Sequence, residues 1–156
     1  MLNPNTFVLT RTFTKPPEAV FAAFADPKKK RRWMADGHDH HVDHYHADFR
    51  VGGKDEGQYR LSDTTPFPGV VMTSEEIYLE IAANERIVSA STMTLGGNLI
   101  SASLASFEIE PHGDGGAKLT FTHQALFYPV SDGPDMRRDG WNKLLDTLHD
   151  TVHNNG

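Results

Sequence analysis

Hydrophobic and polar positions alternate along several short stretches of this chain, which is the pattern of a strand with one buried face. Near the start, residues 6–13 place Phe7, Leu9 and Phe13 on one side and mostly threonine on the other. The same alternation recurs in four later stretches: 71–82, 87–95, 98–110 and 117–127. We therefore predict a series of consecutive β-strands, with a Gly-Gly-Asn hairpin joining two of them.

The stretch 71–82 carries apolar side chains on one face and polar side chains on the other. The apolar face, expected to be buried, consists of Ile77, Leu79 and Ile81. The opposite face, expected to be solvated, consists of Glu76, Tyr78 and Glu80. A carboxylate pair for acid–base chemistry is the alternative interpretation of these residues.

Two short helices are predicted between the first strand and the next. Pro17 suits a first helical turn, where a missing N–H matters least, and an apolar stripe including Phe24 follows it. Asp26 then offers an N-cap for a second helix, which contains the basic run "KKKRR" at 28–32. We interpret this run as a solvated helix face rather than a phosphate-binding patch.

A long helix is predicted at the end of the chain. Its apolar positions recur with a period of 3.6 residues, at Trp141, Leu144, Leu145, Leu148 and Val152. Asp139 lies near its expected start, after a polar loop at 131–140. Consecutive hairpin-linked strands followed by a helix predict an α+β fold, an antiparallel sheet covered by the terminal helix.

Composition narrows the function classes. The chain has 156 residues, which predicts a single domain spanning 1–156, and it has no cysteine, which excludes disulfides and thiolate metal sites. Its formal charge of −6 argues against non-specific nucleic-acid binding. The N-terminus lacks a signal-peptide pattern, and no apolar run approaches the roughly 18 residues of a membrane span. We therefore expect a cytoplasmic protein with no membrane span.

Several segments together resemble one family. They are "TRTFTKPPEAVFAAFADPKKKRRW" at 10–33, "DFRVGG" at 48–53, "YLEIAANERIV" at 78–88, "FEIEPHGDGGAKLTFTH" at 107–123 and "GWNKLLDTL" at 140–148. The chain resembles the START-like (SRPBCC, helix-grip) superfamily, in the branch related to the C-terminal domain of the Aha-type ATPase activator of heat-shock protein 90. The resemblance implies a curved antiparallel sheet wrapped around the terminal helix, with a cavity between them.

Five of the nine histidines fall within residues 37–53, which raises the question of a metal site. The resemblance places 42–50 on a strand, where alternation directs His44, His46 and Asp48 outward. A catalytic zinc site needs three protein ligands, an open position and supporting residues, whereas the two or three ligands available here lie on the side of the sheet away from the expected cavity. The favoured interpretation is therefore no metal and no other cofactor; the alternative is a surface site at His44, His46 and Asp48, which His38, His40 and His41 could join from the preceding loop.

The inward faces of two strands supply the candidate ligand-binding residues. His123 shares a face with the apolar Phe121, and the face that carries Phe107 also carries small residues, which leave space beneath the helix. The candidates are His123, Trp141, Phe121, Ser101, Ser103, Ala105, Phe24 and Leu145. His123 is either a neutral core histidine or a polar contact for a ligand.

Three functions agree with these residues. The favoured one is a module that binds a small apolar or amphipathic molecule between sheet and helix, without turnover. The second is an enzyme of the cyclase, hydrolase or isomerase kind with His123 as acid or base; no catalytic residue is assigned. The third is a co-chaperone-like interaction module. The sequence does not decide the oligomeric state, and a homodimer is one compatible assembly.

Overall fold

The computed structural model describes residues 1–154; residues 155–156, the end of the domain predicted at 1–156, lie outside that description. The described part forms one antiparallel sheet and three helices, which confirms the predicted α+β, helix-grip fold. The elements are β1 (Asn3–Phe13), α1 (Pro17–Ala25), α2 (Pro27–Met34), β2 (His40–His46), β3 (Lys54–Leu61), β4 (Val71–Ala82), β5 (Arg86–Leu95), β6 (Asn98–His112), β7 (Gly116–Phe127) and α3 (Gly133–Asn154).

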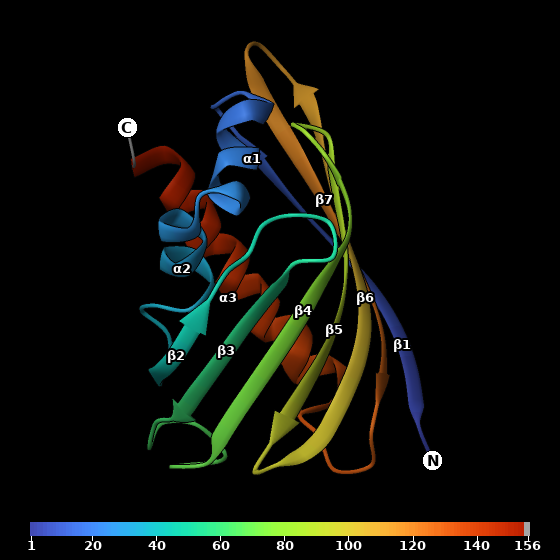
Figure 1. The fold of residues 1–156 in the computed structure, drawn as a ribbon. Helices are drawn as coiled ribbons and strands as arrows, with labels where there is room; N and C mark the ends of the chain where they lie inside the picture. The colour runs from blue at the N-terminus through green and yellow to red at the C-terminus, as the bar shows by residue number, and fades with distance from the viewer. Residues whose placement is uncertain (155–156) are drawn as a thin grey trace.

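The sheet has the strand order β1-β7-β6-β5-β4-β3-β2, so β1 and β2 form its edges. All three helices lie on one face of the sheet, and the strands curve around α3 (Figure 1). None of the helices described over residues 1–154 is long and apolar enough to cross a membrane. The inner face, between sheet and helices, is therefore where both the core and any enclosed site must lie.

Alternation in the neighbouring strands β1 and β7 builds the apolar part of this inner face. In β1, Phe7 pairs with His123 of β7 and Leu9 pairs with Phe121, so these four side chains face the same way. All four are at least nine-tenths buried. The predicted inward orientation of His123 is thus confirmed.

The two short helices are positioned by specific local contacts. Pro17 occupies the first turn of α1, and the Asp26 carboxylate caps α2 by accepting the backbone N–H of Lys28 at 2.9 Å. The fully buried Trp33 donates its indole N–H to the carbonyl of Ala23 at 2.8 Å, which joins α2 to α1. This contact fixes the direction in which α2 presents its side chains.

The terminal helix packs its predicted stripe toward the sheet but begins earlier than expected. Leu145 and Leu148 are fully buried, while Trp141 is partly buried against the core. The helix starts at Gly133, not near Asp139, so the expected polar loop is largely helical. Pro134 is compatible with a helix that starts at Gly133, because the first turn does not need its missing N–H. The additional turn contains one buried residue, Arg137.

The predicted faces of β4 are wrong along most of the strand. Tyr78 is 1% exposed whereas Leu79 is 50% exposed, so the tyrosine and Glu76, not the aliphatic residues, point inward. A β-bulge between Tyr78 and Glu80 then inserts one extra residue and reverses the alternation, which returns Ile81 to the core. Apolar character alone misassigned this strand because its inward polar groups have partners on α2.

Candidate ligand-binding site

A partly enclosed cavity of about 60 Å³ lies between the inner face of the sheet and helices α2 and α3. Its apolar wall consists of Met34, Met93, Ala105 and Trp141. Its polar and charged wall consists of Lys30, Tyr45, Asp55, Glu56, Tyr59, Ser74, Glu76, Ser91, Ser103, His123 and Arg137. A ligand here would meet both kinds of surface, and the volume is well below the roughly 300–1,000 Å³ of drug-sized sites.

The floor of the cavity is made of small side chains from neighbouring strands. Ser103 of β6 pairs with Ser91 of β5, and their hydroxyls are hydrogen-bonded at 2.6 Å. Two residues further along β6, Ala105 pairs with His123 of β7. Because serine and alanine do not reach the helices, the space above them stays open.

Four of the eight predicted site residues line this cavity: Ser103, Ala105, His123 and Trp141. The other four lie behind its wall. Phe121 packs against Trp141 with ring centroids 4.3 Å apart, whereas Phe24 and Leu145 belong to the apolar core. Ser101 is buried and accepts a hydrogen bond from Arg137 at 2.9 Å. Face alternation identified the inward side chains, but it does not separate the cavity wall from the core.

His123 is 2% exposed and stacks on Phe7 with ring centroids 4.7 Å apart. Burial, together with the positive charge of Arg137, lowers the pKa of His123 to about 4, so its imidazole is neutral at pH 7. Its Nδ1 atom is buried and has no hydrogen-bond partner among residues 1–154. Such an atom is unusual, because most buried polar atoms in proteins are hydrogen-bonded.

Arg137 lies in the extra turn of α3 and is 6% exposed. Its Nε donates to Asp132 Oδ2 at 2.7 Å and its Nη2 donates to Asp132 Oδ1 at 2.9 Å, a bidentate ion pair. The positive charge next to His123 is therefore balanced locally. The sequence-based prediction missed Arg137 because it placed this segment in a solvated loop.

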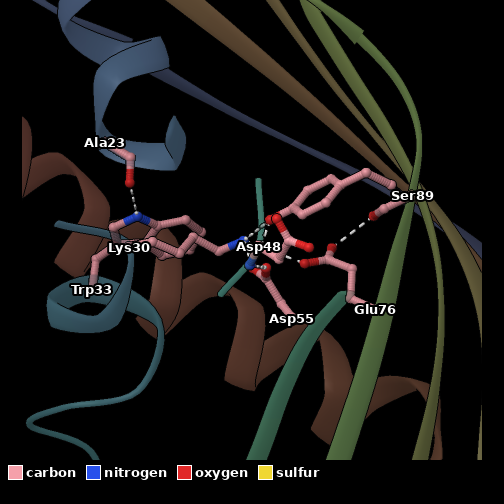
Figure 2. Close-up of polar contacts among 8 residues, drawn as sticks. Ala23, Lys30, Trp33, Asp48, Asp55, Glu76 and Ser89 are labelled. Carbon is pink, nitrogen blue, oxygen red and sulfur yellow. Dashed lines mark hydrogen bonds and ion pairs between the residues drawn. The ribbon is translucent and has the colours of Figure 1, made fainter. Parts of the chain in front are cut away.

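A second group of buried charges surrounds Lys30 on the same cavity (Figure 2). The Lys30 ammonium donates to Asp55 Oδ2 at 3.0 Å, to Glu76 Oε1 at 3.3 Å and to the Tyr78 hydroxyl at 3.0 Å. Tyr78 in turn donates to Asp55 Oδ2 at 2.6 Å, and Ser89 donates to Glu76 Oε2 at 2.6 Å. We call these five residues the Lys30 cluster; it ties α2 to β3, β4 and β5.

The Lys30 cluster holds its lysine in the charged form. Burial by itself lowers the pKa of Lys30, but Glu76, the tyrosines and Asp55 together raise it well above its ordinary value. A lysine nucleophile or base needs the neutral amine, so this environment does not suit either role. Lys30 is thus an ion-pair partner rather than a reactive group.

The interpretation of "KKKRR" as a solvated face is wrong for Lys30, which is 3% exposed. Lys30 precedes Trp33 by three residues and Met34 by four, so a helix places all three on one face. That spacing was a signal for burial. The carboxylates that pair with Lys30, those of Asp55 and Glu76, were not expected to point inward. The faces of β4 had been assigned the wrong way round, and charged side chains were assumed to be solvent-exposed.

Two tyrosines complete the far end of the cavity. The hydroxyl of Tyr45 on β2 is buried and, like His123 Nδ1, has no hydrogen-bond partner within residues 1–154. Burial raises the pKa of Tyr45, so the hydroxyl keeps its proton. Tyr59 lies over Gly57, where a Cβ atom would stand 2.2 Å from the tyrosine hydroxyl, so only glycine fits there.

The histidine-rich segment has a different role. His38 and His40 turn back to the carbonyls that end α2, with Nε2 of His40 2.5 Å from the oxygen of Ala35. β2 ends at His46, before the predicted end at residue 50, so Asp48 lies beyond the strand, where it binds Arg50. Within residues 1–154 no three histidine, aspartate or glutamate side chains come together as a metal site.

The curved antiparallel sheet, the two short helices after β1 and the gripping terminal helix define a START-like, helix-grip domain. The profile of the family described as "Activator of Hsp90 ATPase homolog 1-like protein" matches residues 14–153. The chain therefore belongs to this Aha1-like family of the START-like superfamily. No functionally curated protein matches the chain.

Similar solved structures extend over almost the whole chain. A putative uncharacterized protein from Rhizobium leguminosarum shares 31% identity at a TM-score of 0.89, covering 99% of this chain and 97% of its own. The Mll3558 protein from Rhizobium loti shares 32% identity at a TM-score of 0.84, covering 97% of this chain and 99% of its own. CalU16 from Micromonospora echinospora, at 16% identity and a TM-score of 0.60, shares the fold, with 97% and 85% covered.

Proposed function

We propose that this protein binds a small amphipathic molecule in the cavity between the sheet and α3, without chemical turnover. The observation that carries the proposal is the cavity itself, whose lining includes His123 and Tyr45, two residues that each hold a buried polar atom without a hydrogen-bond partner in the described part of the chain. Leaving such an atom unpaired costs about 1–3 kcal/mol. A ligand with polar groups would supply the missing hydrogen bonds, while its carbon atoms would contact Met93, Ala105 and Trp141.

The cavity also limits the size of the ligand. About 60 Å³ admits a molecule of a few non-hydrogen atoms and not a long acyl chain. The sequence-based expectation of an apolar or amphipathic ligand is therefore narrowed to a small amphipathic one. A purely apolar molecule would leave both unpartnered atoms as they are.

Binding is favoured over catalysis by the state of the histidine. A general base works best when its pKa lies near the operating pH, whereas the pKa of His123 is about 4. At pH 7 its imidazole is a weak base but a competent hydrogen-bond acceptor or donor. We therefore assign His123 to ligand anchoring, and an enzyme of the cyclase, hydrolase or isomerase kind is the less supported alternative.

The test fills the cavity. Ala105→Phe places a ring on the cavity floor, and the matched control Ala102→Phe places one on the opposite face of β6, because the two positions are three residues apart. A small amphipathic ligand, identified by native mass spectrometry of freshly purified protein, should bind to the wild type and Ala102→Phe. It should not bind to folded Ala105→Phe. Equal binding to both folded variants would refute the proposal.

A co-chaperone-like interaction module is the second candidate. It is favoured by the family description and by apolar side chains on the outer face of the sheet, with Leu104 39% exposed and Leu126 41% exposed. Such a module would bind its protein partner with the cavity filled. Ala105→Phe should then leave partner binding unchanged, whereas Leu104→Asp should weaken it.

A further inference from the structure

We infer that the ligand of the cavity is a small organic cation, a protonated amine on a short apolar chain. The inference rests on the proposed function and adds the chemical class of the ligand. It follows from the charge of the cavity wall, from the position of the excess charge and from the neutral groups around it.

The wall carries an unbalanced negative charge. Arg137 is neutralised by its bidentate pair with Asp132, and His123 is neutral. The Lys30 cluster, in contrast, sets one ammonium against two carboxylates, those of Asp55 and Glu76. The sum over these groups is −1, and Glu56, a further carboxylate on the wall, makes the wall more negative still. A buried net charge is unfavourable, and a bound cation removes it.

Glu76 is the carboxylate of the Lys30 cluster that a ligand can reach more readily, although Lys30 and Ser89 also bond to it. Lys30 lies closer to Asp55 than to Glu76, at 3.0 against 3.3 Å, and Tyr78 donates to Asp55 only. The Glu76 side chain is also the more accessible carboxylate, at 13% exposed against 6% for Asp55. Glu76 therefore offers a cation a charged acceptor on the cavity wall.

The remaining wall suits an ammonium better than a carboxylate. His123 Nδ1 is an unpartnered nitrogen, and in the Nε2–H tautomer it accepts a hydrogen bond from an N–H donor. Trp141, Tyr45 and Tyr59 present aromatic rings, which attract cations to their faces. An anionic ligand would meet two positive groups on the wall, Lys30 and Arg137, and both are already paired with carboxylates of the protein.

The experiment compares three probes of nearly equal size: propylammonium, propanol and propionate. NMR titration follows the indole N–H signal of Trp141, which lines the cavity, while the buried Trp33 indole, bound to the Ala23 carbonyl, serves as an internal reference. Propylammonium should bind at least about tenfold more tightly than propanol, since a charge pair in a partly buried site is worth more than that factor. Propionate should bind most weakly.

Two matched variants locate the effect. Glu76→Gln removes the excess charge but keeps oxygen and shape, so it should abolish the preference for propylammonium over propanol. Glu75→Gln makes the same change on the adjacent residue, which pairs with the exposed Lys54 instead, and should keep the preference. Circular dichroism and the Trp33 signal verify folding, and the wild-type comparison stands even if Glu76→Gln is unfolded.

Each outcome bears on the inference separately from the proposed function. If propanol or propionate binds as tightly as propylammonium, the cation assignment is wrong, although a small-molecule site remains. If none of the three probes shifts the Trp141 signal, the cation assignment is also wrong, and the Ala105→Phe test decides the proposed function by itself. An equal loss of preference in both glutamate variants would remove Glu76 from the site.

Discussion

Two buried polar regions border the same cavity and differ in how well they are satisfied. In the Lys30 cluster the ammonium has three hydrogen-bond acceptors, and the Tyr78 hydroxyl is bonded as well (Figure 2). Around His123, in contrast, the imidazole stacks on Phe7 while Nδ1 remains unpartnered. Both regions are almost entirely shielded from solvent.

The difference separates the Lys30 cluster, which holds the fold even though its Glu76 can also meet a ligand, from His123, whose proposed role is ligand binding alone. A satisfied buried network holds its elements in register, here α2 against β3 and β4. A buried polar atom without a partner contributes no such restraint and lowers the stability of the empty protein. We therefore expect apolar replacement to destabilise the protein strongly in the Lys30 cluster and only weakly at His123.

The largest effect should come from Lys30→Met, which keeps the chain length and removes the charge. Two carboxylates, Asp55 and Glu76, would then be buried without a cation, which should lower the free energy of unfolding by about 3–5 kcal/mol. Urea denaturation measures this change. The exposed Lys28→Met is the control and should change stability by less than about 0.5 kcal/mol. Similar values for both variants would show that the Lys30 cluster does not hold the fold.

A smaller effect should appear on acidification. The pKa of His123 is about 4 in the folded protein against 6.5 for an ordinary histidine. Between these values the unfolded chain binds a proton that the folded protein does not, so His123 lowers stability as pH falls from 6.5 toward 4. Measuring the free energy of unfolding of His123→Phe and of the wild type at pH 7 and pH 4.5 isolates the contribution of His123. The wild type should lose about 2 kcal/mol more than the variant; equal losses would mean that His123 titrates normally.

The smallest effect should be that of His123→Phe at pH 7 in the absence of ligand. Phenylalanine keeps a planar ring beside Phe7 and removes an unpartnered nitrogen, so stability should change by less than about 1 kcal/mol. Thermal or urea unfolding at pH 7 measures it. A loss comparable to that of Lys30→Met would indicate a hidden partner for His123 and would erase the contrast between the two regions.

Much of the fold could be predicted from the sequence. Alternation in β1, β6 and β7 identified the inward residues, and the period of Leu145 and Leu148 identified the gripping face of α3. These signals are local, because a strand or helix that buries one face repeats its apolar positions at a fixed interval. Prediction was wrong in β4, where inward polar residues are satisfied by a different part of the chain.

The candidate site could be predicted only in part. Ser103, Ala105, His123 and Trp141 line the cavity as expected, and their ligand-binding role stays a prediction. Lys30, Tyr45, Glu76 and Arg137 also line it and were not among the predicted site residues. A charged or hydroxylated side chain is expected at the surface until a partner for it is known.

The sequence by itself therefore determined the order of the elements, the family and the apolar faces of every strand discussed except β4, because these depend on neighbours within a few residues. Tertiary structure alone decided which polar residues are buried. Lys30 meets Asp55 and Glu76 across 25 and 46 residues, and Arg137 reaches Ser101 across 36. Whether a charge is buried depends on compensation by groups brought together from distant segments. For the same reason only the folded chain shows that His123 Nδ1 and the Tyr45 hydroxyl are buried without a hydrogen-bond partner among the described residues.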